Sequence, residues 1–345
     1  MSRIAFSWRG LPFYAAGLLS RAIQTLGEDC DVIGTPPTVP VKGMEQALGS
    51  PICWIDHDVP TSWADHRLDI PKVFFQSGWG YPAINSLGDE VRRSGGRVIG
   101  MSDTNWRGDF RQLVLGTLAF RMRLRSKFDA MLVPGAQGRR LMRLYGFGDD
   151  EIYEGMYGAN PDVFIGGPPL NTRAKEFLFV GQFVERKNIL RLARVFIRFA
   201  QQRPDWQLRL CGSGELRDHI PQHPRIIVQD FLQAEELSAL YRNARVFVLP
   251  SLIEAWGLVV HEAALSGCAL LLSDQIGSAD DLAGAHNACS FVATDDESLL
   301  SALHEAAAMN DHGWEAADGE SCAKARKFGP ERFAREVAAI VDRFG

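Results

Sequence analysis

Short apolar runs alternate along the chain with segments whose apolar residues recur at helical spacing. This alternation is typical of α/β folds, in which helices connect the strands of a parallel sheet. The N-terminal half predicts strands at Ile4–Trp8, Ile52–Ile55, Val73–Gln76, Val98–Met101 and Ala130–Val133. It predicts helices over 13–27, 107–126 and 136–145.

The alternation is more regular in the C-terminal half. Strands are predicted at Phe177–Val180, Leu208–Cys211, Val246–Leu249 and Ala269–Leu272. Helices are predicted over 188–202, 234–243, 257–265 and 330–343. Serial strand–helix units form a parallel sheet with right-handed crossovers, and ligands bind such sheets at the carboxyl ends of the strands.

A glycine- and proline-rich segment separates the two halves. Ile165–Leu170 reads Ile-Gly-Gly-Pro-Pro-Leu, which permits a bend and continues neither a helix nor a central strand. We therefore expect two Rossmann-like domains, 1–165 and 166–325, whose parallel sheets face a central cleft. A C-terminal helix within 326–345 would cross back to the first domain.

Composition excludes several classes of protein. Of the 345 residues, 46% are hydrophobic and 23% charged, as in ordinary globular chains, and no apolar run is long enough to span a membrane. The N-terminus lacks the features of a signal peptide, and a net charge of −5 does not favour nucleic-acid binding. The six cysteines form no Cys-x-x-Cys pair, so we expect reduced thiols in a cytoplasmic protein.

The segment PSLIEAWGLVVHE, which ends at Glu262, joins a predicted strand to a predicted helix. A helix that begins near Gly257 would point its first amides at an anion. Glu254 would then reach a neutral part of a phosphate-bearing ligand, and Glu262 would accept hydrogen bonds from a diol such as ribose. The alternative is a capping acid followed by a solvated helical glutamate.

Three further turns follow predicted strands. Gly181 precedes Arg186 and Lys187 at a helix start, where the helix dipole disfavours cations unless an anion binds there; the alternative is a surface cation pair. Gly212 opens a Gly-x-Gly turn, a weak phosphate signal because the third glycine of the dinucleotide fingerprint is absent.

The third turn follows the first strand. There Gly10 would let the backbone approach a phosphate, and Arg9 would add positive charge. The alternative is an ordinary strand–helix turn.

Residues 176–285 resemble the donor-binding domain of family-4 glycosyltransferases of the GT-B fold. The matching runs are FVGQFVERKN, LRLCGSGEL and YRNARVFVLPSLIEAWGLVVHEAALSGCALLLSD, with Glu-x7-Glu at 254 and 262 as the most specific part. The resemblance implies a retaining, front-face transfer of a sugar from a UDP- or GDP-sugar, without metal or cofactor. The first domain would bind a saccharide or lipid-linked acceptor, and the second domain the donor.

The resemblance also implies roles for individual residues. Lys187 would contact the diphosphate, Glu254 the donor sugar and Glu262 the ribose. The amides near Gly257, Leu258 and Val259 would bind phosphate and sugar.

Two positions depart from the family pattern. Gln182 stands where many members have arginine, so Arg186 or Arg9 would have to supply that charge. Asp103 follows a strand that in many members ends in a sugar-contacting histidine, which makes it a candidate catalytic residue or, alternatively, a helix cap.

Two other features suggest different partners. Asp56-His57-Asp58 imitates the Asp-x-Asp of metal-dependent glycosyltransferases, but that spacing arises by chance at this aspartate frequency, so we expect no metal. A basic amphipathic helix over 107–127 would contact anionic lipid peripherally at the inner face of the membrane; the alternative is a solvated helix face.

Rival functions are a sugar-nucleotide hydrolase or epimerase, and an inactive glycosyltransferase-like binding subunit.

Overall fold

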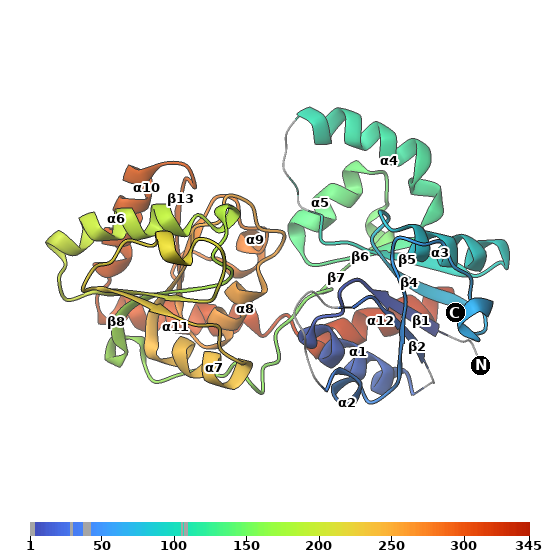
Figure 1. Cartoon of the computed structure of the whole chain (residues 1–345), viewed down its shortest axis with the longest axis horizontal. Coiled ribbons are helices and arrows are strands. Elements are labelled where there is room, and N and C mark those ends of the chain that lie inside the picture. Colours follow the sequence, from blue (N-terminus) through green and yellow to red (C-terminus); the bar gives the residue numbers. More distant parts are fainter. Residues whose placement is uncertain (1–3, 28–29, 37–42, 105, 107–109) are drawn as a thin grey trace. The chain divides into compact units, whose positions relative to one another are not determined.

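The computed structural model describes residues 4–27, 30–36, 43–104, 106 and 110–345 and divides into two compact units (Figure 1). The first unit comprises Met1–Gly158 with Phe328–Gly345, and the second comprises Ala159–Lys327. The segment between 159 and the predicted boundary at 165 belongs to the second unit. Two hydrogen bonds fix it there, from Ala159 N to His261 Nδ1 (2.9 Å) and from Ser238 Oγ to Val163 O (2.7 Å).

In the described part of the first unit, a seven-stranded parallel sheet has the order β3-β2-β1-β4-β5-β6-β7. Its strands are β1 Ile4–Trp8, β2 Cys30–Gly34, β3 Ile52–Trp54, β4 Val73–Ser77, β5 Arg97–Met101, β6 Ala130–Val133 and β7 Ile152–Glu154. β1, β4 and β6 are buried along their whole length, because helices cover both faces of the sheet.

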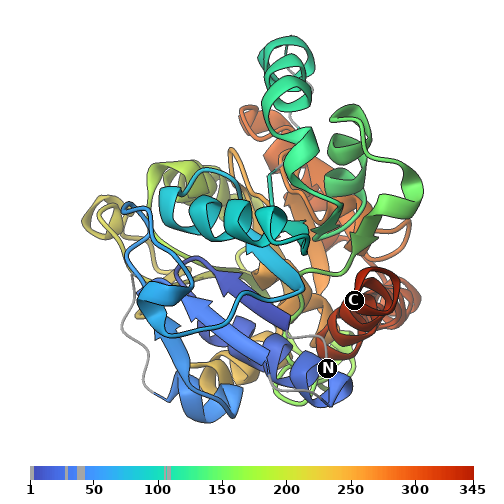
Figure 2. The same ribbon diagram turned by 90° about the vertical axis from the view of Figure 1, so that its right-hand side faces the viewer.

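Two helical layers enclose this sheet (Figures 1 and 2). One contains α1 (Phe13–Leu26), α2 (Met44–Leu48) and α12 (Pro330–Phe344), which share an apolar core with β1. The other contains α3 (Pro82–Arg93), α4 (Thr117–Arg123) and α5 (Ala136–Leu144). The C-terminal helix therefore completes the first unit after the chain has formed the second.

The second unit has, among its described residues, a six-stranded parallel sheet in the order β10-β9-β8-β11-β12-β13. Its strands are β8 Ala174–Val180, β9 Gln207–Cys211, β10 Ile226–Gln229, β11 Ala244–Leu249, β12 Ala269–Ser273 and β13 Ala288–Phe291. Its helices are α6 Ile189–Gln202, α7 Ala234–Asn243, α8 Leu258–Leu265, α9 Ala279–Leu282, α10 Asp296–Ala307 and α11 Asp311–Ala325.

The expected α/β class with two Rossmann-like parallel sheets is confirmed. The predicted helix 107–126 differs in its details: 107–109 lie outside the described residues, Arg111–Gly116 form a π-helical segment, and α4 follows. No helix of the described chain is long and apolar enough to cross a bilayer.

Candidate functional site

The strands of the second unit end at one edge of their sheet, and most of the predicted site residues lie in the loops at that edge. Gly181 follows β8 and Gly212 follows β9, and the two turns are packed backbone to backbone. A Cβ atom at Gly212, whose φ is 149°, would lie 1.9 Å from the carbonyl oxygen of Gly181. Glycine at 212 is therefore a steric requirement of this loop pair.

A left-handed residue fixes the loop that carries the cations. Asn188 has a φ of 58°, and its side-chain amide donates to Pro250 O (3.2 Å) and Ala293 O (2.9 Å). The backbone of Arg186 accepts a hydrogen bond from Leu252 N (2.8 Å). These bonds join the loop after β8 to the loop after β11.

The joined loops bring Lys187 and Glu254 into contact. Lys187 is 6% exposed, and its Nζ donates a hydrogen bond to Glu254 Oε2. The same oxygen lies 3.7 Å from Arg186 Nη1 and accepts a hydrogen bond from Ser251 Oγ (3.4 Å). Burial lowers the pKa of Lys187 from its ordinary value, and the charge of Glu254 opposes that change.

The N-terminus of α8 lies directly after Glu254. Gly257 caps it with a φ of 85° and, as a glycine, provides no side-chain cap for its first amides. Val260 N donates to Gly257 O (2.9 Å), whereas the amides of Leu258 and Val259 are the first of the helix, where intrahelical partners are lacking. Glu254 is held beside them by backbone bonds from Glu254 N to Gln275 O and from Gly277 N to Glu254 O, both 3.1 Å.

Glu262 lies farther along α8 and is partly buried. The hydroxyl of Tyr241, on α7, donates to Glu262 Oε2 at 3.0 Å. Burial raises the pKa of Glu262 to about 7, although the hydrogen bond from Tyr241 acts in the opposite direction. This carboxyl group therefore changes its charge near neutral pH.

The neighbouring His261 is a structural residue that the sequence analysis missed. It is fully buried, its Nδ1 accepts from Ala159 N (2.9 Å), and its Nε2 therefore carries the proton donated to Ala325 O (2.8 Å). Burial lowers the pKa of His261 to about 4, so the ring is neutral at pH 7. These two hydrogen bonds connect α8 to Ala159, the first residue of the second unit, and to Ala325, near its end.

The candidates of the first unit lie at the carboxyl ends of β1 and β5, which β4 separates. Gly10, with a φ of 60°, donates from its backbone to Thr35 Oγ1 (2.7 Å). Arg9 is exposed, and its guanidinium lies over the ring of Tyr81, 4.7 Å from the centroid. The structure thus shows both in an ordered strand–helix turn.

Asp103, after β5, is exposed and accepts a hydrogen bond from the hydroxyl of Tyr157 (2.8 Å). Tyr157 packs against Trp8 and Tyr14, so an aromatic cluster supports the carboxylate from within the unit. Burial raises the pKa of Tyr157 well above its ordinary value, which keeps the hydroxyl protonated and able to donate.

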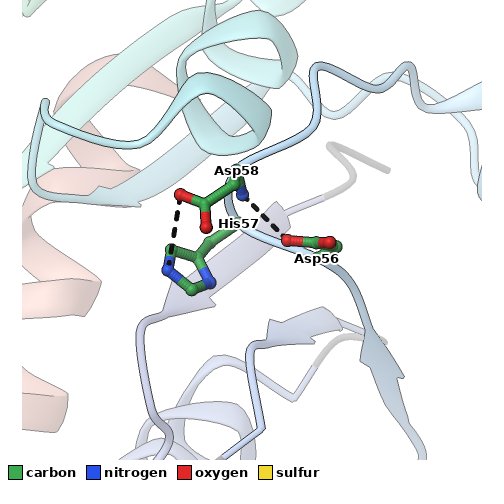
Figure 3. A group of neighbouring side chains, drawn as sticks. All are labelled: Asp56, His57 and Asp58. Carbon is green, nitrogen blue, oxygen red and sulfur yellow. Dashed lines mark hydrogen bonds and ion pairs between the residues drawn. The ribbon is translucent and has the colours of Figure 1, made fainter.

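Asp56, His57 and Asp58 form a compact group in the first unit (Figure 3). One ligand atom from each lies within 4.8 Å of the others, close enough in principle to share a cation. The contacts within the group are local: Asp58 N donates to Asp56 Oδ1 (3.0 Å), and Asp58 Oδ1 lies 3.6 Å from His57 Nε2. Both aspartates are exposed, as is common for acidic groups that bind no ion.

Two curated relatives resemble parts of this chain. An uncharacterized glycosyltransferase of Methanocaldococcus jannaschii is 30% identical over 106 residues, which cover 29% of this chain and 27% of the relative. A D-inositol 3-phosphate glycosyltransferase of Pseudarthrobacter chlorophenolicus is 29% identical over 153 residues, or 38% of this chain and 36% of the relative. The matched segments thus span only about a third of these relatives.

Solved structures resemble the whole chain at low identity. HepE of Anabaena, in complex with UDP and glucose, has a TM-score of 0.73 at 13% identity, with 99% of this chain and 100% of that chain covered. Sucrose-phosphate synthase of Thermosynechococcus elongatus has a TM-score of 0.73 at 16% identity, with 99% of both chains covered. These likenesses show the shared fold.

Residues 164–325, nearly all of the second unit, match the family model described as glycosyl transferases group 1. The second unit therefore resembles the domain of group 1 glycosyltransferases, and the whole chain shares the fold of the solved glycosyltransferase structures.

Proposed function

We propose that this protein transfers a sugar from a UDP- or GDP-sugar to a saccharide acceptor, free or lipid-linked, and retains the anomeric configuration. The supporting observation is the convergence of Lys187, Glu254 and the N-terminus of α8 at one edge of the second unit's sheet. The narrower family-4 assignment, the absence of a metal and a cytoplasmic location are parts of the same proposal.

The charges at this edge suit a nucleoside diphosphate leaving group. Negative charge grows on the phosphate as the bond to the sugar breaks, and a buried ammonium beside helix amides stabilises such charge without a metal. A diphosphate would compete with Glu254 for Lys187, so that the carboxylate becomes available to sugar hydroxyls. Arg186, whose side chain is 47% exposed, supplies a second cation near the position that Gln182 leaves neutral.

Three other positions shape the rest of the donor site. Gly181 and Gly212 allow the turns after β8 and β9 to pack closely at the edge where the phosphate would bind. Glu262, on the same helix whose amides bind the phosphate, accepts hydrogen bonds from the two ribose hydroxyls. Its hydrogen bond with Tyr241 sets the direction of the carboxylate.

The chemical step needs no protein nucleophile. The bond between the anomeric carbon and the phosphate oxygen breaks, and the acceptor oxygen bonds to the same face of that carbon. The acceptor proton passes to the departing phosphate oxygen. Asp103, supported by Tyr157, would position hydroxyls of the reacting sugars, with Arg9 and Gly10 on the same edge of the first unit's sheet.

The test is turnover of UDP- and GDP-sugars with and without a panel of saccharide acceptors, followed by release of the nucleoside diphosphate. We expect acceptor-dependent release and, by NMR, an unchanged anomeric configuration in the product. Equal release without acceptor would indicate a hydrolase, a new sugar epimer an epimerase, and binding without turnover an inactive subunit. Lys187→Ala should abolish release, whereas Lys175→Ala should not, because Lys175 lies at the amino end of β8 in a surface pair with Asp205.

A lipid-linked acceptor would suit the segment 110–123, which includes α4 and projects from the first unit (Figures 1 and 2). Phe120 packs inward, but four other large apolar side chains are exposed: Phe110 by 72%, Leu115 by 60%, Leu118 by 57% and Met122 by 73%. No acidic residue occurs between 110 and 127, whereas this stretch has five basic residues. Such a face would insert into a bilayer that carries anionic lipid.

A further inference from the structure

A cavity of about 400 Å³ lies at the carboxyl end of β3 in the first unit, and the donor site does not account for it. Its lining residues are Pro36, Trp54, Ile55, Asp56 and His57. Since the strands of this sheet are parallel, the cavity opens on the same edge as Arg9 and Asp103. An aromatic ring with a few polar groups is a typical lining for a small-molecule site.

Trp54 provides an aromatic surface in this cavity. It is the last residue of β3 and is 40% exposed, which is unusual for so large an apolar ring. A Cβ atom at Gly34, on the adjacent β2, would lie 2.9 Å from the indole Cζ3. The ring therefore lies against bare glycine backbone, which leaves part of the indole available to a ligand.

The polar groups beside Trp54 are held in place by neighbouring loops. The backbone of His57 accepts a hydrogen bond from Ala83 N (3.2 Å), and its ring meets the edge of Tyr81 at 5.7 Å. Arg9 covers the same Tyr81 ring. In Figure 3 the Asp58 carboxylate turns toward His57, while the Asp56 carboxylate lies on the other side of the chain, where it is exposed.

An indole face with a carboxylate and an imidazole is suited to a sugar. The apolar C–H face of a pyranose packs on an aromatic ring, while its hydroxyls donate to a carboxylate and exchange hydrogen bonds with imidazole. The carboxylate of Asp56 would repel an anion, so a neutral ligand with hydroxyl groups suits the cavity better than a phosphate.

The position of the cavity indicates the length of the ligand. The strand order places the ends of β3 and β5 four strands apart. At a spacing of about 4.8 Å per strand, Trp54 and Asp103 are separated by roughly 19 Å along the sheet edge. A single sugar ring cannot contact both residues, whereas an oligosaccharide can.

We propose that Trp54, Asp56 and His57 form a distal subsite that binds one ring of an oligosaccharide acceptor. The inference rests on the proposed function for the identity of the ligand as an acceptor. It extends that function by assigning an acceptor of several sugar units and an aromatic residue that recognises it.

The test is binding of the full chain to an array of mono- to hexasaccharides, with Trp54→Ala, Gly34→Ala and Ile70→Ala in parallel. Ile70 is a matched control because it is 39% exposed but precedes β4, at the opposite edge of the sheet. We expect the affinity for longer saccharides to fall at least tenfold in Trp54→Ala. It should also fall in Gly34→Ala, because the new methyl group displaces the indole. Ile70→Ala should bind as the unaltered protein does. Trp54→Phe should restore part of the binding.

Three results would overturn the inference: no saccharide binding by the unaltered protein, equal binding by Trp54→Ala, or loss of binding in EDTA. The last result would mean that a cation bound at Asp56-His57-Asp58 holds the sugar. Donor turnover measured on the same samples separates the two proposals. If the protein turns over the donor but Trp54→Ala does not change saccharide binding, the subsite is refuted and the proposed transfer is not. Saccharide binding that depends on Trp54, without any donor turnover, refutes the proposed transfer and its acceptor role.

Discussion

The affinity for the nucleotide should depend on pH through Glu262. Burial raises the pKa of this carboxyl to about 7, although the hydrogen bond from Tyr241 opposes the increase. The ionised form is the better acceptor for two ribose hydroxyls, so binding should favour the ionised carboxylate. The affinity for UDP or GDP should therefore increase as the pH rises through 7.

The size of this effect follows from the fraction of Glu262 that is ionised. With a pKa near 7, about one part in eleven is ionised at pH 6 and about ten parts in eleven at pH 8. If only the ionised form accepts both hydroxyls, the affinity increases by up to about tenfold over this range. The same titration affects stability in the opposite sense, because a raised acidic pKa makes the folded state less stable as the pH rises from 4.5 through 7.

The assay is calorimetric titration of the nucleoside diphosphate at pH 6, 7 and 8. The ligand also titrates in this range, since the second pKa of a phosphate is near 6. Glu262→Gln is therefore the control: it keeps the titration of the phosphate but removes that of the carboxyl. Only the additional pH dependence of the unaltered protein belongs to Glu262.

Equal pH profiles for the unaltered protein and Glu262→Gln would refute the reasoning, and so would an affinity that falls as the pH rises. Thermal unfolding provides a second readout on the same samples. Glu262→Gln should raise the stability of the free protein more at pH 8 than at pH 5, by roughly 1–3 kcal/mol at the higher pH.

Three further predictions concern the loop glycines, the metal and the lipid face. Gly212→Ala should lower the unfolding free energy by about 2–4 kcal/mol in denaturant titrations, because its methyl would collide with Gly181 O, whereas Gly319→Ala, in open space on α11, should not. EDTA should leave sugar transfer unchanged; a loss that Mg²⁺ or Mn²⁺ restores would contradict the metal-independent mechanism. Leu115→Glu with Leu118→Glu should abolish co-sedimentation with anionic vesicles, and equal sedimentation of this variant would refute lipid contact.

Much of the second unit could be predicted because its signals are local in sequence. Lys187 and Glu254 each follow a strand by a few residues, and parallel strands bring such loops to one edge. The structure adds their direct contact, which depends on Asn188 in a left-handed conformation that no local pattern specifies. Glu262 was singled out by its spacing, but its elevated pKa comes from burial within the folded unit, which the local sequence does not show.

Residues whose role depends on distant partners could not be predicted. His261 bonds to Ala159 and Ala325, which are far away in the chain, and from sequence alone it is one polar residue in an apolar helix. Trp54 lies within the predicted strand Ile52–Ile55, where no sequence pattern indicated its exposure, and that exposure depends on Gly34 in β2. That strand was itself missed, because Cys30 and Asp31 open it with little apolar character.

The central claim is that the loops at the carboxyl edge of the second unit's sheet bind a nucleoside diphosphate through Lys187. The measurement that tests it most directly is calorimetric titration of UDP and GDP into the unaltered protein, Lys187→Ala and Lys175→Ala. We predict that at least one nucleotide binds, that Lys187→Ala weakens it by at least about tenfold, since a charged hydrogen bond contributes about 1.5–3 kcal/mol, and that Lys175→Ala binds normally. Failure of both nucleotides to bind, or equal affinity in Lys187→Ala, would contradict the account.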